Sequence, residues 1–408
     1  MKTFGQAIAA IVVLVAGWLL GKSRTRQATA LPPMDPVRGS IVRFVVKHPW
    51  WTAGGIGTVL LVGGAVVVLS GVMPIKASSG HWSITARFLD FAKVRSVATH
   101  SWGIQAPPLD GEGLLLKGAG HYDVGCYPCH GRPGTGVPAV MAAMTPPPPE
   151  LSETLSRWSP EELFSIVKHG IKFTGMPAWP VQQRDDEVWA VVSFLRRMPD
   201  LDATAYRQLA YGETGVRADI TPNLSMVGES PPPLAVRDVC WRCHGTDGTG
   251  RGPGVFPSLA GQRSDYLYAS LRAFRERTRF SGIMSAVAAT LSDETMREIA
   301  AYYERLPPRA GSPDDASDGG AAIAARGIPD RDIPACAECH GPSAQPKNPT
   351  YPRLAGQHVR YLTSQLELLK EHRRGGSPNV NLMQVFVHRL RQEEIRDVAR
   401  HYAALPDR

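Results

Sequence analysis

All six cysteines of this 408-residue chain fall into three copies of one motif, Cys-x-x-Cys-His. The copies are Cys126-Tyr-Pro-Cys129-His130, Cys240-Trp-Arg-Cys243-His244 and Cys336-Ala-Glu-Cys339-His340. Two thiols at this spacing can form half of a zinc site or a redox-active dithiol, and with a histidine directly after them they can attach a c-type haem. Separate zinc half-sites would have to share ligands between distant segments. Three copies that use every cysteine therefore favour covalent haem attachment.

A methionine follows each motif at a similar distance. Met176, Met284 and Met383 lie 46, 40 and 43 positions after the respective motif histidine. Methionine is often core filler, but three matched offsets indicate thioether ligands of iron. An iron bound by histidine and methionine has no open axial position, which suits electron transfer and disfavours oxygen or peroxide chemistry. The predicted axial pairs are His130 with Met176, His244 with Met284, and His340 with Met383.

The repeat extends beyond the ligands. Phe256-Pro-Ser-Leu-Ala-Gly-Gln262 is echoed by Tyr351-Pro-Arg-Leu-Ala-Gly-Gln357. Residues 184–199, 291–307 and 390–406 each combine an acidic start, apolar residues three and four positions apart, and a proline near the end. This pattern predicts an amphipathic helix at the end of each copy, with an aromatic side chain on its buried face. The sequence thus predicts three repeated helical modules.

These segments resemble class I c-type cytochrome domains, which are all-α folds that surround one haem each. The second and third, with their Leu-Ala-Gly-Gln sequence, resemble dihaem cytochrome c4, and the first, with Gly175-Met-Pro-Ala-Trp179, is similar to the monohaem domains of oxidase and dehydrogenase cytochrome subunits. The resemblance implies three covalently bound haem c groups, electron transfer in place of enzymatic catalysis, and no catalytic residue. A haem peroxidase or sensor would need an open iron position.

The resemblance also implies that a proline carbonyl accepts a hydrogen bond from the second ring nitrogen of each motif histidine. The candidates are Pro257 for His244, Pro352 for His340, and either Pro138 or the prolines of 146–149 for His130. The proline-rich residues 230–236 replace the helix expected before the second motif. The remaining histidines, such as His121, are expected to be surface or packing residues.

Two apolar segments precede the modules. Residues 50–74 are uncharged and long enough to cross a bilayer, which takes about 20 residues. Residues 7–21 are shorter, and Ala28-Thr-Ala30 would suit cleavage of a signal peptide. We favour an uncleaved hairpin, or one span with the first segment partly inserted, because cleavage would leave a single span that directs the modules inward. The loop between the segments carries Lys22, Arg24, Arg26, Arg38, Arg43 and Lys47. The positive-inside rule therefore places this loop in the cytoplasm and the modules in the periplasm.

The net charge of +8 does not indicate a nucleic-acid partner. Residues 1–100 carry eleven Lys/Arg and two Asp/Glu, so the rest of the chain is close to neutral. The balance is −4 for residues 101–225, −1 for 226–319 and +4 for 320–408. These differences in charge can be those of ordinary solvated surfaces, or they can steer different partner proteins to the two ends of the chain. The sequence leaves both interpretations open.

The predicted organisation is a membrane anchor, a juxtamembrane amphipathic segment and three cytochrome modules with two linkers. The bounds are 1–76 for the anchor, 77–108 for the juxtamembrane segment, 109–200 for module 1, 201–230 for a linker, 231–308 for module 2, 309–319 for a linker and 320–408 for module 3. The expected partner is a terminal oxidase, which the cytochrome c4 resemblance and the anchor favour. The alternative is a periplasmic dehydrogenase that oxidises an alcohol or aldehyde.

Overall fold

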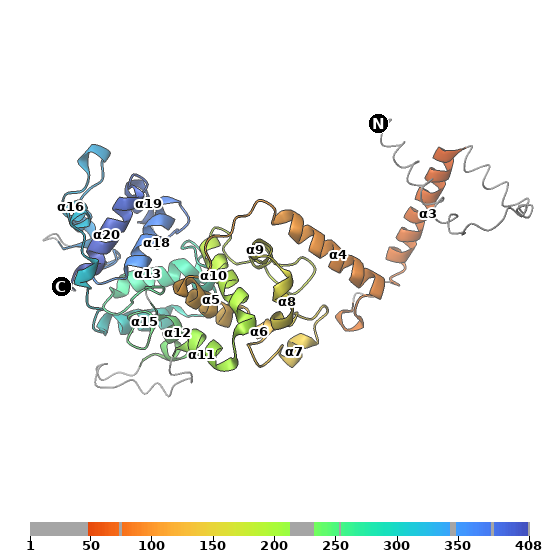
Figure 1. The fold of residues 1–408 in the computed structure, drawn as a ribbon, viewed down its shortest axis with the longest axis horizontal. Coiled ribbons are helices and arrows are strands. Elements are labelled where there is room, and N and C mark those ends of the chain that lie inside the picture. The colour runs from red at the N-terminus through yellow and green to blue at the C-terminus, as the bar shows by residue number, and fades with distance from the viewer. Residues whose placement is uncertain are drawn as a thin grey trace, which may run out of the picture. The chain divides into compact units, whose positions relative to one another are not determined.

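The structure is a computed structural model that describes residues 48–72, 76–212, 232–252, 254–342, 348–376 and 379–406. Within these ranges the elements are helices, joined by loops with three isolated β-bridges (Figure 1). The predicted all-α class is therefore confirmed. The chain divides into two compact units, residues 1–79 and 80–408. The predicted segment 7–21 and the basic loop lie outside the described residues.

The first unit contains α3 (Pro49–Leu69), a 21-residue helix without a charged side chain. None of its residues is buried, and a proline at its first turn starts the helix where no backbone donor is lost. In the described part of the chain it is the one helix long and apolar enough to cross a membrane. The short 3₁₀ helix η1 (Ala77–Ser79) follows.

Module 1 is built around two crossing helices, α5 (Glu112–Gly125) and α10 (Asp185–Arg197) (Figure 1). Gly118 permits this crossing, because a Cβ there would overlap the carbonyl oxygen of Ala190. The other elements of this part of the chain are α4 (Ser83–His100), α6 (Tyr127–His130), α7 (Ala139–Ala142), α8 (Leu151–Thr154), η2 (Leu155–Arg157), α9 (Pro160–His169), η3 (Met198–Asp200) and α11 (Ala203–Tyr211).

Helix α11 lies where the sequence predicted the start of a linker. Asp202 caps its first turn by accepting from the backbone of Thr204 and Ala205. Tyr206 and Ala210 are buried in the core of module 1. Module 1 therefore continues to the end of α11, and residues 213–231 lie outside the described part.

Modules 2 and 3 share the same order of helices after the motif. Module 2 comprises the π-helix η4 (Val236–Cys240), α12 (Trp241–His244), α13 (Ser264–Arg275), α14 (Gly282–Ala289) and α15 (Asp293–Arg305). Module 3 comprises η5 (Pro313–Asp315), α16 (Asp318–Arg326), η6 (Pro329–Arg331), α17 (Ala337–His340), α18 (Val359–Lys370), α19 (Val380–Val387) and α20 (Gln392–Ala404). Instead of a regular helix, a π-helix leads into the second motif, in agreement with the proline-rich sequence before it.

The three amphipathic helices predicted at the module ends are α10, α15 and α20. Each has acidic residues in its first turn, which favour the positive end of the helix dipole. Each buries an aromatic side chain as predicted, and these are Phe194, Tyr303 and Tyr402. The predicted linker 309–319 is also ordered against module 3, where Ser312 donates from its backbone to Ala403.

Candidate haem sites

Each Cys-x-x-Cys-His motif forms one helical turn. In the first and third motifs the backbone of the histidine donates to the carbonyl of the first cysteine at 3.0 Å. Residues three and four positions apart share one helix face, so the two thiols and the imidazole point to the same side. The glycine after each histidine has φ between 72° and 80°, which ends the turn where another residue would be strained.

The motif histidines meet the predicted proline carbonyls. Nδ1 of His244 lies 3.1 Å from the Pro257 oxygen, and Nδ1 of His340 lies 3.1 Å from the Pro352 oxygen. Both predictions are confirmed. For His130 the structure selects Pro149, at 3.5 Å, from the open candidates.

This contact fixes which nitrogen faces the iron position. A carbonyl only accepts, so Nδ1 must carry the proton and donate it. The unprotonated Nε2 then remains for a metal ion, and the hydrogen bond makes it more basic. Burial lowers the pKa of all three imidazoles, so the neutral form that binds metal persists at neutral pH.

The six cysteines are free thiols without disulfides. Burial raises the pKa of Cys126 and Cys240 to about 12, and that of Cys243 and Cys336 to about 11. A redox-active dithiol would need a low pKa that favours thiolate. Within the described ranges no group of three or more His, Cys, Asp or Glu side chains is placed to hold a metal ion. The motifs thus fit covalent attachment to a porphyrin.

The predicted ligands of modules 2 and 3 line a common cavity of about 370 Å³. The cysteines and histidine of both motifs contribute to its wall, together with Met284 from α14 and Met383 from α19. Met176 lies in the loop between α9 and α10, where its backbone donates to Thr174 Oγ1 at 3.1 Å. All three methionine ligands stay predictions.

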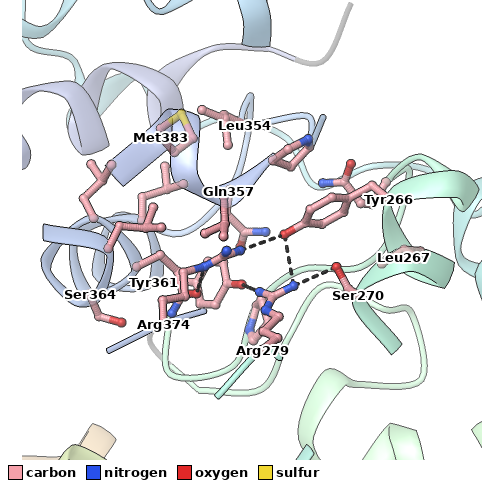
Figure 2. A pocket seen from close by; sticks show the side chains of 18 of the residues that line it. Tyr266, Leu267, Ser270, Arg279, Leu354, Gln357, Tyr361, Ser364, Arg374 and Met383 are labelled. Atoms are coloured by element: carbon pink, nitrogen blue, oxygen red, sulfur yellow. Dashed lines mark hydrogen bonds between the residues drawn. The ribbon is translucent and has the colours of Figure 1, made fainter. Parts of the chain in front are cut away.

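The buried Arg279 and the partly buried Arg374 face this cavity between modules 2 and 3. Figure 2 shows the hydroxyl of Tyr266 between the guanidinium groups of Arg279 and Arg374, each 3.3 Å away. Arg279 also donates to Ser270 at 2.7 Å and to Tyr361 at 3.1 Å. Burial raises the pKa of Tyr266, but the two guanidinium groups outweigh this and lower it to about 8.

The described part of the chain provides no carboxylate partner for either arginine. A buried cation needs a compensating negative charge. Haem carries two carboxylates, so these arginines suit a cavity that holds it. The hydroxyls of Tyr303 and Tyr402 also lie beside the motif cysteines, and the buried hydroxyl of Tyr402 has no hydrogen-bond partner. No sequence motif pointed to the arginines, which lie 35 and 34 positions after their motif histidines.

The structure assigns a role to the repeated Leu-Ala-Gly-Gln sequence. Gln357 of module 3 donates to the carbonyl of Ser258 and accepts from its backbone nitrogen, both at 2.9 Å. Gln262 of module 2 makes the same pair of bonds with Arg353, also at 2.9 Å. Ser258 and Arg353 directly follow Pro257 and Pro352, which fix the histidines. The exchange therefore joins modules 2 and 3 next to both sites.

Parts of the chain match two protein families. The family described as "Cytochrome c" matches residues 234–306 and 320–402. The family described as "Cytochrome C oxidase, cbb3-type, subunit III" matches residues 113–195.

Individual relatives agree with these families. A "Thiosulfate dehydrogenase electron acceptor" of Stutzerimonas stutzeri is 36% identical over 184 residues, which cover 43% of this chain and 81% of that protein. A "Cytochrome c4" of Thiocapsa roseopersicina is 35% identical over 171 residues, covering 41% and 87%. A solved cytochrome c4 from Acidithiobacillus ferrooxidans is 32% identical and has a TM-score of 0.36, covering 41% of this chain and 98% of that one.

Proposed function

The chain belongs to the cytochrome c family, and on this premise we propose that it carries electrons from a periplasmic dehydrogenase to a membrane-bound terminal oxidase. It is a multihaem electron-transfer protein and not itself an enzyme. Haem c supplies the one-electron chemistry when it is bound. The chain's own residues decide where that chemistry occurs and which proteins it serves.

Three kinds of side chain would set each site. The paired cysteines hold the porphyrin edge covalently, and the motif histidine offers Nε2 because its Nδ1 is held by a proline carbonyl. Met176, Met284 and Met383 would each supply the second protein ligand of one iron. A site closed on both sides excludes substrates and favours outer-sphere electron transfer.

The observation that carries the proposal is the joining of two kinds of module in one chain. Residues 113–195 match a cytochrome subunit of a cbb3-type oxidase, and residues 234–402 contain two Cytochrome c matches. Two relatives are electron acceptors of thiosulfate dehydrogenase. We therefore place the two partners considered above at opposite ends of one route, with modules 2 and 3 as acceptor and module 1 as donor to the oxidase.

The relatives also favour one class of dehydrogenase. Their names support an enzyme that oxidises thiosulfate over an alcohol or aldehyde dehydrogenase. Thiosulfate oxidation releases electrons one pair at a time, and three haems in one chain could take up both. The alcohol or aldehyde enzyme remains the alternative donor.

Membrane anchoring belongs to the same proposal. Helix α3 supports it by length and composition. Helix α4, at the start of the second unit, exposes Ile84, Phe88 and Phe91, each by 65% or more. We propose that α3 holds the chain in the inner membrane and that the modules lie on its periplasmic side.

Reconstitution tests this route. The full chain with its haems would be mixed in detergent with thiosulfate dehydrogenase and thiosulfate, and haem reduction followed by visible absorbance. Membranes containing cbb3-type oxidase would then be added and oxygen uptake recorded. Reduction followed by oxygen uptake supports the proposal. If only an alcohol or aldehyde dehydrogenase reduces the haems, the alternative donor is correct. If the haems are reduced but no oxygen is taken up, the oxidase is not the acceptor.

A further inference from the structure

One buried carboxylate links the first and second haem motifs. Asp123 lies on α5, three residues before Cys126, and is 2% exposed. It accepts from Arg132 Nε at 3.1 Å and from Arg242 Nη1 at 2.6 Å. Arg132 directly follows the glycine that ends the first motif, whereas Arg242 lies between the two cysteines of the second.

Helix α11 completes the surroundings of this carboxylate. Tyr206 donates to Asp123 at 2.7 Å, and Tyr211 donates to it at 2.8 Å. Burial raises the pKa of Tyr211 to about 12, so its hydroxyl keeps its proton and remains a donor. The ring of Tyr211 also stacks on Trp241, which is inside the second motif. Asp123 is thus fully hydrogen-bonded, as a buried charge must be.

Helix α5, which carries Asp123, approaches the second motif at a further point. A Cβ at Gly120 would lie 3.5 Å from Cys243 Sγ and 3.4 Å from the ring of Phe256. Three residues later comes Asp123, and Cys126 caps the end of the helix. One face of α5 therefore runs from the haem-bearing sulphur of module 2 to that of module 1.

A second buried carboxylate holds the modules together on the α10 side. Glu187 is 2% exposed and accepts from Ser281 Oγ at 2.6 Å and from the backbone of Gly282 at 2.7 Å. It also accepts from Trp179 Nε1 at 3.2 Å. The orientation of module 1 on module 2 is consequently fixed by two carboxylates on different helices.

We propose that this contact makes the first and second haems a fixed electron-transfer pair, with Asp123 acting on the reduction potentials of both. The inference deepens the proposed relay and rests on it, because it states where electrons cross inside the chain. Asp123 is a positioning residue that acts through charge. A negative charge stabilises ferric over ferrous haem, and its effect falls with distance. It should therefore reach the two adjacent haems and not the third.

Asp123→Asn tests this charge effect. We expect two of the three midpoint potentials to rise together and the third to stay unchanged, as measured by spectroelectrochemical titration of the holoprotein. Arg242→Gln removes a positive charge from the same cluster and should shift potential in the opposite direction. This second variant keeps the test decisive if Asp123→Asn does not accumulate, because loss of packing alone would not reverse the sign.

Asp293→Asn is the matched control. Asp293 also binds two arginines and a tyrosine, but its side chain is 43% exposed and does not line the cavity. It should leave all three potentials unchanged. If Asp123→Asn shifts only one midpoint potential, all three, or none, the proposal that Asp123 acts on the first and second haems is wrong.

Gly120→Leu tests the crossing itself. The added side chain must push α5 away from Cys243 and Phe256. If the first and second haems form a fixed pair, electrons should equilibrate between them in a fast phase after photochemical reduction. We expect Gly120→Leu to lose that phase. Gly111→Leu, where a Cβ meets nothing within 4 Å, should keep that phase. A fast phase retained in Gly120→Leu would contradict the proposal. Both measurements use the isolated chain without a partner protein. A result that contradicts the haem pair would therefore not contradict the proposed dehydrogenase and oxidase partners.

Discussion

At the scale of single residues, the iron sites depend on which face of each imidazole is free. The Pro257 and Pro352 carbonyls occupy Nδ1 of His244 and His340, so Nε2 points into the cavity that Met284 and Met383 line. A thioether is a weak, neutral donor that raises the haem potential. Replacing it should therefore change both the spectrum and the ligand binding of one haem at a time.

Alanine at each methionine is the first prediction. Met176→Ala, Met284→Ala and Met383→Ala should each make one haem in three five-coordinate, so that the reduced protein binds one carbon monoxide where the unaltered protein binds none. Loss of the near-infrared methionine-to-iron band by about one third should accompany this. Met296→Leu is the control, since Met296 is fully buried and does not line the cavity. A variant that keeps the whole band would exclude its methionine as a ligand.

A second prediction concerns His121, expected from the sequence to be a packing residue and found buried without a partner for Nδ1. Burial lowers its pKa to about 4. The positive charges of Lys117 and Arg184 add to this, whereas the carboxylates of Glu187 and Asp186 partly oppose it. The unfolded chain takes up a proton near pH 6.5, but the folded chain does so only near pH 4. The stability of module 1 should therefore fall as the pH drops from 6.5 to 4, by at most about 3 kcal/mol.

Denaturant unfolding at several pH values measures this loss. In His121→Leu the group that titrates is absent, so the difference between pH 7 and pH 4 should be smaller by about 3 kcal/mol. Parallel pH profiles for the two proteins would show that His121 is not responsible.

Residue spacing predicted the covalent sites because attachment to one rigid ring requires thiols and imidazole within one helical turn. The resemblance to class I c-type cytochrome domains predicted Pro257 and Pro352, since both follow their histidine by about a dozen positions. It left Pro149 unresolved because four prolines stand together there, and only the folded loop shows which carbonyl reaches His130. Arg279 and Arg374 escaped prediction because such arginines have no characteristic spacing.

At the scale of helices, modules 1 and 3 solve the same packing problem. In module 1 helix α5 crosses α10 at Gly118, and in module 3 helix α16 crosses α20 at Gly320. In both places a Cβ would overlap a backbone carbonyl, of Ala190 and Asp397 respectively. Glycine therefore lets α5 and α10, and likewise α16 and α20, approach at backbone distance.

Gly118→Ala should separate α5 from α10. Overpacking of this kind costs about 1–3 kcal/mol, which outweighs the gain in helix propensity from alanine. The unfolding free energy of the holoprotein should fall by that amount. Gly125→Ala in the same helix is the control, because its Cβ would make only an ordinary contact at 3.9 Å. Equal stability of the two variants would contradict the role of Gly118.

The amphipathic helices were predictable because apolar period, acidic start and terminal proline all agreed. Helix α11 was not, because its polar sequence after a proline resembles a linker. Its two buried residues, Tyr206 and Ala210, acquire their role only when Asp123 and the core of module 1 are in place. Such tertiary contacts cannot be predicted from the local sequence pattern.

At the scale of the whole molecule, function divides along the boundary near residue 80. All six motif cysteines, the three histidines and the three methionines lie in the unit 80–408, and α3 lies in the other. Electron transfer and membrane attachment should therefore be separable by mutation.

A chain without residues 1–79, exported by a cleavable signal peptide, should be soluble, carry three covalent haems and keep its three midpoint potentials. Fractionation, haem staining and redox titration measure this. Because a charged side chain is costly within a bilayer, replacing Val59 and Leu60 of α3 by lysine in the full chain should likewise release it from membranes, which controls for the loss of the N-terminal residues. A truncated chain that remains membrane-bound after a salt wash would assign the attachment to the apolar face of α4, with Phe88 and Phe91, and not to α3.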